Sequence, residues 1–299
     1  MNVAEERHTL RGTSKTDEPM ARHTSWRVGG PADCFYQPAD IDDLAAFLSQ
    51  LPADEPLLWV GLGSNLLVRD GGIRGTVIAP SGMLKGLSVF DHTVVRAEVG
   101  VASAKVARFA ADKDLAGCEF FAGIPGTVGG ALAMNAGAFG GETWEVVQAV
   151  ETVNRQGDIR IREKSEFDIA YRSVKGLNEE WFVAAHFKLN EGVGNEVRAQ
   201  IKQLLAKRDT SQPMQTANAG SVFKNPVDDH AARLIDSAGL KGTCVGKACV
   251  SDVHANFIIN TGGARAADIE HLINKIKNEV QQRHGVELER EVRIVGEVL

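Results

Sequence analysis

The sequence predicts an α+β fold before residue 192 and a smaller α/β domain after it. In the first part, short runs of β-branched and aliphatic residues alternate with glycine-rich turns, a pattern that indicates strands. In the second part, apolar residues recur at helical spacing, which indicates helices with one buried face. A chain of 299 residues is long enough for this two-domain arrangement.

The strands of the first part are expected in short segments with glycine or proline turns. These segments are LLWVGLG (57–63), GTVIAP (75–80), TVVRAEVG (93–100) and AVETVNRQGDIRI (149–161). The last segment predicts two strands joined by an Asn-Arg-Gln-Gly turn. Helical patterns lie between the strands: one follows Asp40, a suitable N-cap, and another begins at Ser103.

The helical patterns of the second part have distinct apolar faces. These faces comprise Val197, Ile201, Leu204 and Leu205 in the first pattern, and Ile269, Leu272, Ile273, Ile276 and Val280 in the last. Between them, DHAARLIDSAGL predicts a capped helix that ends at Gly239, a residue suited to a left-handed C-cap. A strand-like tail, VELEREVRIVGEVL (286–299), closes the chain.

Composition excludes several classes of protein. A net charge of -6 and a pI near 5.8 argue against nucleic acid as the main partner, because phosphates need a basic surface. The apolar runs are too short for membrane insertion. The start of the chain is polar and acidic, so we expect a flexible lead-in over residues 1–20 and not a signal peptide. We expect no metal site and reduced, buried thiols at the scattered cysteines Cys34, Cys118, Cys244 and Cys249.

The first glycine-rich loop, VGLGSNLLVRDGGIRG, spans residues 60–75. Gly61 and Gly63 let the backbone approach a ligand, and successive N–H groups in such a loop can bind an anion. The loop holds only the start of a G-x-G-x-x-G pattern, lacks the G-K-[ST] of a P-loop and does not open a helix, so neither nucleotide site is predicted. A tight hairpin between strands explains this loop equally well.

The second glycine-rich loop, AGIPGTVGGALAMNAGAFGGE (122–142), has almost no charge. Its glycines are Gly123, Gly126, Gly129, Gly130, Gly137, Gly140 and Gly141. A glycine in regular structure costs roughly 0.5–1 kcal/mol relative to alanine, so this density indicates a function. Disorder is the alternative, but the interleaved Ile, Val, Leu, Met and Phe are too apolar for it. We therefore expect a backbone wrapped around a flat ligand that makes many hydrogen bonds.

Ordered motifs from about Thr24 to the C-terminus resemble the family of UDP-N-acetylenolpyruvoylglucosamine reductases. The motifs are TSWRVGG (24–30), GSNLLVRDGG (63–72), GIPGTVGGALAMNAGAFGGE (123–142), AYRSV (170–174), NAGSVFKNP (218–226), AARLIDSAGLKG (231–242), HANFIIN (254–260) and EVRIVGE (291–297). One glycine loop alone would be a weak match, whereas this series follows the order of the family.

The resemblance implies an FAD-binding domain of the vanillyl-alcohol-oxidase-like (PCMH) type over residues 21–192, with subdomains of about 21–85 and 86–192. It implies a substrate-binding domain over 193–285 and a C-terminal strand, 286–299, that returns to the first domain. FAD should be non-covalent, because neither glycine loop contains the His or Cys of a covalent flavin link. The residues expected to bind FAD are Gly61, Leu62, Gly63, Ser64, Asn65, Gly123, Pro125, Gly126, Thr127, Gly129, Gly130, Asn135, Ala136 and Gly137.

By the same resemblance, the chain is expected to be a cytoplasmic, monomeric enzyme of peptidoglycan precursor synthesis. It would use NADPH to reduce UDP-N-acetylglucosamine enolpyruvate to UDP-N-acetylmuramate. NADPH comes from the resemblance alone, since the sequence contains no dinucleotide fingerprint for it. Two alternatives stay open: an oxidase of alcohols or hydroxy acids with the same fold, and an FAD-binding sensor without enzymatic activity.

The resemblance implies Arg172, Ser221 and Glu291 as catalytic residues. Arg172 can hold a carboxylate by two parallel hydrogen bonds that strengthen as the carboxylate becomes an enediolate. Ser221 is the expected proton donor, and its surroundings lack the G-x-S-x-G pattern of a nucleophilic serine. Glu291 helps only if it is protonated or balanced by Arg172, and Glu289 shares its strand face, so the choice between these two glutamates is open. Without the resemblance, Arg172 would be a solvated charge and Ser221 a turn residue.

Lys224 and Asn225 are the expected substrate-binding residues. A lysine can meet a phosphate as a point charge, and an asparagine can bind a sugar or uracil edge. Some family members clamp the substrate through an additional loop with a tyrosine. Here YRSVKGLNEEWFV leads almost directly to the next strand, and Tyr36 and Tyr171 are the only tyrosines. The chain therefore resembles the compact subclass without the Tyr loop.

Overall fold

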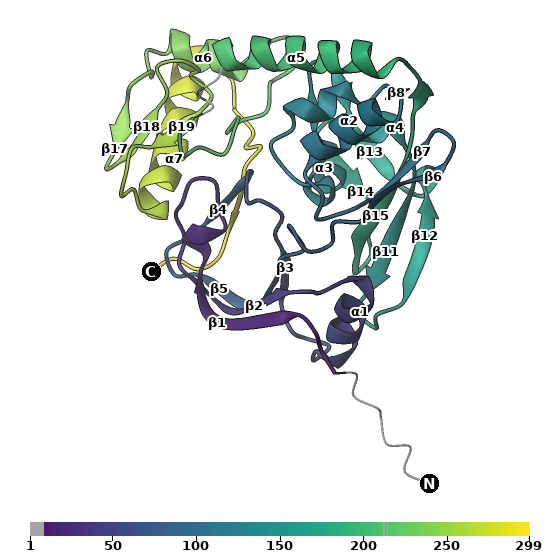
Figure 1. Cartoon of the computed structure of the whole chain (residues 1–299). Helices are drawn as coiled ribbons and strands as arrows, with labels where there is room; N and C mark the ends of the chain where they lie inside the picture. The colour runs from purple at the N-terminus through teal and green to yellow at the C-terminus, as the bar shows by residue number, and fades with distance from the viewer. Residues whose placement is uncertain (1–8, 212, 214) are drawn as a thin grey trace. The chain divides into compact units, whose positions relative to one another are not determined.

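The chain forms two compact units that are interleaved along the sequence. The computed structural model describes residues 9–211, 213 and 215–299. The first unit contains the described residues up to Lys15, together with Phe35–Gly61 and Thr76–Leu204. The second contains Thr16–Cys34, Leu62–Gly75 and the described residues of Leu205–Leu299. Figure 1 shows the chain with many of its helices and strands labelled.

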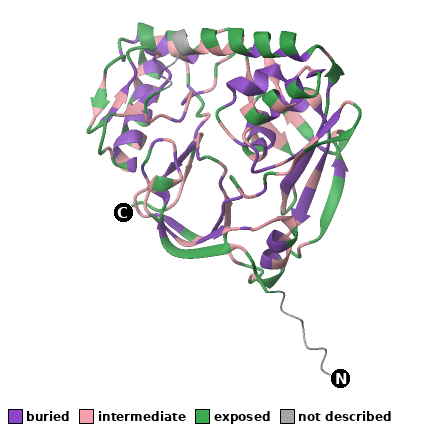
Figure 2. Cartoon of the chain, in the orientation of Figure 1, coloured by how far each residue is buried: buried purple, intermediate pink, exposed green. Residues whose placement is uncertain are grey.

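The first unit is built around a five-stranded sheet with the order β12-β11-β15-β7-β6. Its strands are β6 (Leu87–Asp91), β7 (Val94–Glu98), β11 (Val147–Asn154), β12 (Ile159–Glu163) and β15 (Glu180–Lys188). Neighbouring strands are antiparallel, and the β11–β12 pair confirms the two strands expected around the Asn-Arg-Gln-Gly turn. Figure 2 shows β11 mostly buried and the edge strand β12 mostly exposed.

Several helices and short turns belong to the first unit. They are α1 (Ile41–Gln50), α2 (Ser103–Asp112), α3 (Val128–Met134), α4 (Thr143–Val146), η2 (Glu119–Gly123) and η3 (Lys164–Glu166). Among them, α3 packs on β15 and β7 of this sheet. The expected cap of α1 is confirmed, because the Asp40 side chain accepts a hydrogen bond from the N–H of Asp43. Helix α2 begins at Ser103, as its sequence predicts.

Short strand pairs hold the loops of the first unit. They are β8 (Leu115–Ala116) with β16 (Asn190–Glu191), β9 (Gly137–Ala138) with β10 (Gly141–Glu142), and β13 (Asp168–Ala170) with β14 (Ser173–Lys175). The β9–β10 pair closes the end of the second glycine loop, and the turn between β13 and β14 contains Arg172. Strand pairing thus fixes the end of the second glycine loop and the turn that contains Arg172.

A four-stranded sheet has the order β1-β2-β5-β3. Its strands are β1 (Thr13–Pro19), β2 (Pro31–Gln37), β3 (Leu57–Trp59) and β5 (Ile73–Ile78), and the division between the units falls within β1, β2 and β5. The flexible lead-in expected over residues 1–20 is wrong for Thr13–Pro19, which forms β1, while residues 1–8 of that lead-in lie outside the described part. The domain boundaries expected near residues 85, 192 and 285 stay a prediction.

The second unit combines a small sheet with two helices and a parallel strand pair. Its elements are η1 (Met20–Arg22), α6 (Ala231–Ser237), α7 (Ala266–His284), the sheet of β17 (Cys244–Val245), β18 (Ala248–Val250) and β19 (Ile258–Asn260), and the parallel pair of β4 (Leu66–Val68) and β20 (Arg293–Val295). Helix α5 (Gly194–Ser211) begins in the first unit and ends in the second.

The helical faces expected from the sequence are largely buried, and that of α7 forms part of the core of the second unit. All the predicted apolar positions of α7 are buried. In α5, Val197 and Ile201 are buried, whereas Leu204 and Leu205 are half-buried. Gly239 follows α6 with a φ of +70°, which confirms the expected left-handed end of that helix.

The TSWRVGG motif has a packing role in the second unit. Trp26 is completely buried, and its Nε1–H donates a hydrogen bond of 2.7 Å to the carbonyl of Ile258. In return, Nδ2 of Asn260 donates to the carbonyl of Trp26 at 2.8 Å. These two bonds join an early motif of the chain to β19.

Cys244 and Cys249 form a disulfide across the β17–β18 hairpin. The expectation of reduced thiols is wrong for this pair, because the tight turn at Gly246 brings the two Cα atoms to 4.1 Å. Cys34 and Cys118 are not part of a disulfide, and burial raises the pKa of Cys118 to about 12. Across residues 9–211, 213 and 215–299, no helix has both the length and the hydropathy to cross a bilayer, and no cluster of His, Cys, Asp and Glu could hold a metal ion.

Candidate active site

The second glycine loop forms an accessible backbone surface at the start of α3. Thr127, the N-cap of α3, is buried. The N–H of Ser103 donates to the carbonyl of Gly126, and the N–H of Gly129 donates to the carbonyl of Val99, both at 3.0 Å. A Cβ added to Gly130 would meet no atom within 4 Å. A ligand can therefore approach the backbone of Gly130 as closely as a side chain would.

Other glycines of the two loops are required by close packing. A Cβ on Gly61 would lie 2.6 Å from Oγ1 of Thr127, so the start of the first loop touches the second. A Cβ on Gly123 would lie 2.3 Å from the ring of Phe139. Pro125 is exposed between these contacts. The structure thus brings Gly61, Gly123 and Thr127 into one backbone surface of the first unit.

The remainder of the first glycine loop belongs to the second unit. Gly63 has a φ of +61°, and a Cβ there would lie 2.1 Å from the carbonyl oxygen of His23. Nδ2 of Asn65 donates a hydrogen bond of 3.0 Å to the carbonyl of Glu291. Leu62 is 49% exposed, and Ser64 beside it is half-buried. Within this unit, the loop therefore contacts the C-terminal EVRIVGE segment directly.

Arg172 lies against the end of the second glycine loop in the first unit. Its Nη1 donates to the carbonyl of Asn135 at 3.3 Å, and its Nη2 donates to the carbonyl of Gly137 at 3.4 Å. Between these residues, the carbonyl of Ala136 accepts a 2.7 Å hydrogen bond from Oγ1 of Thr143. Asn135 and Arg172 have φ values of +44° and +53°, an uncommon conformation for residues other than glycine. Such strained residues cluster at functional sites.

Ser221 and Glu291 are on adjacent backbone segments of the second unit. The N–H of Glu291 donates to the carbonyl of Val222 at 2.9 Å, and the N–H of Val222 donates to the carbonyl of Asn256, also at 2.9 Å. Ser221 follows Gly220, which has a φ of +73°. Both Ser221 and Glu291 are half-buried. The structure therefore brings two of the three expected catalytic residues together, while Arg172 belongs to the first unit.

Lys224 and Asn225 already have protein partners. Nζ of Lys224 lies 2.5 Å from Oε1 of Glu289, and the backbone N–H of Lys224 donates to the carbonyl of Glu289 at 2.9 Å. Oδ1 of Asn225 accepts a hydrogen bond of 3.1 Å from the N–H of Ala231, the first residue of α6. These contacts set the positions of both side chains beside the Ser221 segment.

Asn256 is a site residue that the sequence did not single out. It is 3% exposed, and its side chain bonds twice to the backbone of Phe223, accepting the N–H at 3.0 Å and donating to the carbonyl at 2.8 Å. Next to it, burial lowers the pKa of His254, so the imidazole is neutral near pH 7 and its Nδ1 can accept the N–H of Asn256. The available signal was a polar residue inside the apolar HANFIIN segment.

Glu142 is the second such residue. Its Oε2 accepts a hydrogen bond of 2.8 Å from Nδ2 of Asn135, and its Oε1 lies 3.9 Å from Nη1 of Arg172. It is the single acidic residue of the second glycine loop, and that isolation was the signal in the sequence.

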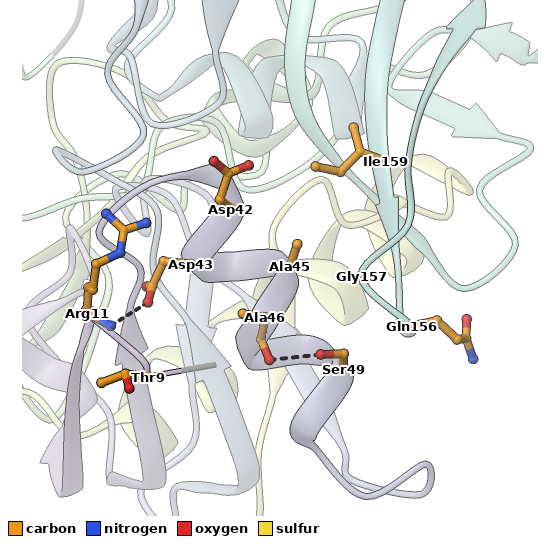
Figure 3. Close-up of a pocket in the computed structure, with 10 residues that line it drawn as sticks. All are labelled: Thr9, Arg11, Asp42, Asp43, Ala45, Ala46, Ser49, Gln156, Gly157 and Ile159. Atoms are coloured by element: carbon orange, nitrogen blue, oxygen red, sulfur yellow. Dashed lines mark hydrogen bonds between the residues drawn. The ribbon is translucent and has the colours of Figure 1, made fainter. Parts of the chain in front are cut away.

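A shallow pocket of about 470 Å³ lies elsewhere in the first unit (Figure 3). It lies beside α1 and the β11–β12 turn, and its lining includes Arg11, Asp42, Asp43, Gln156 and Ile159. One of its acidic side chains already has a protein partner, because Asp43 accepts a hydrogen bond from the backbone N–H of Arg11. None of the residues expected to bind FAD or substrate lines this pocket.

The family described as "FAD binding domain" matches residues 32–161, which contain Gly61 and the whole second glycine loop. The open backbone at Gly130 and the close approach of Gly61 to Thr127 fit FAD as the ligand. A second family, "UDP-N-acetylenolpyruvoylglucosamine reductase, C-terminal domain", matches residues 212–295, which contain Ser221 and Glu291. The fold and the site therefore define a flavoprotein oxidoreductase with a separate C-terminal domain.

Full-length similarities specify the family within that class. The chain is 57% identical to the UDP-N-acetylenolpyruvoylglucosamine reductase of Alkalilimnicola ehrlichii, over 99% of both chains. It is 57% identical to the corresponding enzyme of Methylococcus capsulatus, over 96% of this chain and 94% of that one. The crystal structure of the reductase (MurB) from Thermus caldophilus matches with a TM-score of 0.81 and 32% identity, over 96% of this chain and 99% of that chain.

The chain belongs to the UDP-N-acetylenolpyruvoylglucosamine reductase family. The expected FAD-binding fold with a further C-terminal domain is confirmed. So is the expected activity: the protein is a UDP-N-acetylmuramate dehydrogenase of peptidoglycan precursor synthesis that binds FAD and uses NADPH. The alternatives of an alcohol oxidase and of a flavin-binding sensor are wrong.

Proposed function

We propose that Arg172, Ser221 and Glu291 are the catalytic residues of this reductase. FAD, when bound, supplies the hydride that the enolpyruvyl double bond of the sugar substrate receives. The protein must then stabilise negative charge on the substrate carboxylate and deliver a proton to the neighbouring carbon. The observation that most strongly supports the assignment is the hydrogen bond from the N–H of Glu291 to the carbonyl of Val222, next to Ser221.

Arg172 is assigned to the substrate carboxylate. Its side chain is 15% exposed, and the carbonyls of Asn135 and Gly137 orient its guanidinium. A carbonyl orients a guanidinium without neutralising its charge, so these contacts preserve the attraction for an anion. That attraction increases as charge accumulates on the carboxylate in the transition state.

Ser221 is assigned to proton delivery. A serine hydroxyl is a weak acid, and it can protonate a strongly basic carbanion only from a fixed position. The backbone next to it is held on two sides, by the carbonyl of Asn256 and by the N–H of Glu291. Gly220 permits the turn that precedes it, since its φ of +73° is unfavourable for a residue with a Cβ.

Glu291 rather than Glu289 is assigned to the reacting group. The two residues share a strand face in the sequence, but their surroundings differ. Glu289 is 72% exposed and its carboxylate pairs with Lys224, whereas Glu291 is half-buried and bonds to the backbone beside Ser221. A glutamate that already neutralises a lysine is poorly placed to assist a reacting carboxylate.

Lys224 and Asn225 are assigned to the UDP-sugar. Lys224 would exchange the carboxylate of Glu289 for a phosphate oxygen, an exchange that keeps its charge compensated. The oxygen of Asn225 holds the first turn of α6, so its amide nitrogen is the group we assign to the ligand.

The backbone of the two glycine loops is assigned to FAD, without a covalent link. In the first loop the residues are Gly61, Leu62, Gly63, Ser64 and Asn65, and in the second they are Gly123, Pro125, Gly126, Thr127, Gly129, Gly130, Asn135, Ala136 and Gly137. The accessible backbone of Gly130 supports this assignment most directly. We also propose that the protein is a cytoplasmic monomer of the subclass without the Tyr loop, with domain boundaries near residues 192 and 285.

The catalytic assignment is tested by steady-state turnover of Ser221→Ala. Removing a group that transfers a proton in the transition state should lower kcat by roughly 10²- to 10⁴-fold. Ser237→Ala, in α6 of the same unit, is the matched control and should stay within about twofold of the native enzyme. A native kcat in Ser221→Ala would remove Ser221 from this role.

A further inference from the structure

A carboxylate of the second glycine loop lies beside the arginine assigned to the substrate. Glu142 is in β10, opposite Gly137 in β9. Its Oε1 lies 3.9 Å from Nη1 of Arg172, and its Oε2 accepts the 2.8 Å hydrogen bond from Asn135. We propose that Glu142 is a positioning residue that orients the guanidinium of Arg172 toward the carboxylate of the substrate. This inference rests on the proposed role of Arg172.

Glu142 stabilises a pair of strained residues. Asn135 and Arg172 both have positive φ, and a non-glycine residue in this conformation persists only where its surroundings hold it. Nδ2 of Asn135 is shared between the Glu142 carboxylate and the carbonyl of Ala170, at 3.2 Å. Oδ1 of Asn135 accepts the N–H of Trp144 at 3.1 Å. The Asn135 side chain thus joins the glycine loop to the hairpin whose turn contains Arg172.

The Glu142 carboxylate is itself held in place. It accepts the N–H of Glu145 in a capping box at the start of α4, and Oε2 of Glu145 accepts the N–H of Glu142 at 3.0 Å. Contacts with Asn135, Arg172 and Glu145 leave this side chain little rotational freedom. A fixed carboxylate can define the direction of a guanidinium, which a mobile surface glutamate cannot.

The charge of Glu142 has a predictable effect on the substrate. The two carbonyls that contact Arg172 bear no net charge, whereas the carboxylate of Glu142 adds a negative charge 3.9 Å from its guanidinium. When the substrate carboxylate binds, two carboxylates share one guanidinium and repel each other. Glu142 therefore weakens binding of the ground state while it orients Arg172 for the more highly charged transition state.

The test is Glu142→Gln, which keeps a side-chain oxygen for Asn135 and for the N–H of Glu145 but removes the charge. We expect kcat to fall by about tenfold and KM for the UDP-sugar to fall by about threefold. Glu142→Asp keeps the charge, and it should restore the native KM more fully than kcat. Glu145→Gln is the matched control, because it removes the charge of the other member of the same capping box.

The outcomes separate this inference from the role of Arg172. A residue with only a structural role would lower the melting temperature and the yield of folded protein without lowering KM. If Glu142→Gln has the kcat and KM of Glu145→Gln while Arg172→Ala is inactive, the positioning role is wrong and that of Arg172 survives. If Arg172→Ala turns over at the native rate, the assignment of Arg172 itself is wrong.

Discussion

The backbone N–H of Glu291 donates a hydrogen bond of 2.9 Å to the carbonyl of Val222. Because Val222 follows Ser221 directly, this bond joins the C-terminal segment of the chain to the segment of the proposed proton donor. A second hydrogen bond, from the N–H of Lys224 to the carbonyl of Glu289, joins the same two segments. The two glutamates therefore differ in surroundings although a single residue, Arg290, separates them in the sequence.

Replacing each glutamate by glutamine should reveal that difference. Glu291→Gln is expected to lower kcat by roughly 10²-fold or more, because it changes the group beside the reacting carbon. Glu289→Gln removes the partner of Lys224, so it should alter mainly KM for the UDP-sugar, by about threefold. Steady-state kinetics of the two variants in parallel provide the measurement. The reverse pattern would transfer the catalytic role to Glu289.

Gly130→Ala should separate folding from FAD binding. An added Cβ would meet no protein atom within 4 Å, and alanine favours a helix over glycine by up to about 1 kcal/mol. The FAD-free protein should therefore be as stable as the native protein or slightly more stable. Affinity for FAD should nevertheless fall about tenfold or more if the flavin nucleotide covers this backbone.

Two measurements check this prediction: thermal unfolding of the FAD-free protein, and titration of that protein with FAD by fluorescence. Unchanged affinity for FAD would show that the nucleotide does not approach Gly130, and the assignment of the second loop would need revision at this position.

Glu151 should make stability depend on pH in the acidic range. Burial opposes its ionisation, but hydrogen bonds from His186 and Arg96 outweigh that effect and lower its pKa to about 2 from the usual 4.5. Since the pKa is lowered in the folded state, the stabilisation is complete above about pH 4.5 and is lost as pH falls toward 2. At pH 7 it is worth roughly 3 kcal/mol.

Glu151→Gln should accordingly lower the free energy of unfolding at pH 7 by about 2–3 kcal/mol. The difference from the native protein should shrink as pH falls below 4.5, where the carboxylate takes up a proton in the unfolded chain but not yet in the folded protein. Urea unfolding at several pH values measures it, with the exposed Glu191→Gln as a control. A difference independent of pH would exclude the charge as its cause.

Local features of the fold followed from the sequence because neighbouring residues determine them. Asp40 caps α1 through the N–H of Asp43, and Gly239 ends α6 in the conformation that its missing Cβ permits. The disulfide of Cys244 and Cys249 was not anticipated, although Gly246 between them is suited to a tight turn. The strand at Thr13–Pro19 was missed because its polar sequence lacks an apolar alternation.

The site required contacts between residues that are distant in the sequence. The resemblance to the family supplied Arg172, Ser221 and Glu291, but it did not indicate what holds them. Asn256 bonds to Phe223 and Glu142 contacts Arg172 only after separate segments have packed together. No periodicity or local motif reports such pairings, since they depend on strand register and loop geometry rather than on neighbouring residues.

We propose that Ser221 delivers the proton to the enolpyruvyl carbon, and the two half-reactions of Ser221→Ala test this role most directly. The variant should be purified with FAD, reduced anaerobically with NADPH, and then mixed rapidly with UDP-N-acetylglucosamine enolpyruvate. We predict reduction by NADPH at the native rate, followed by reoxidation by the sugar that is at least about 10²-fold slower than in the native enzyme. Reoxidation at the native rate would contradict the account.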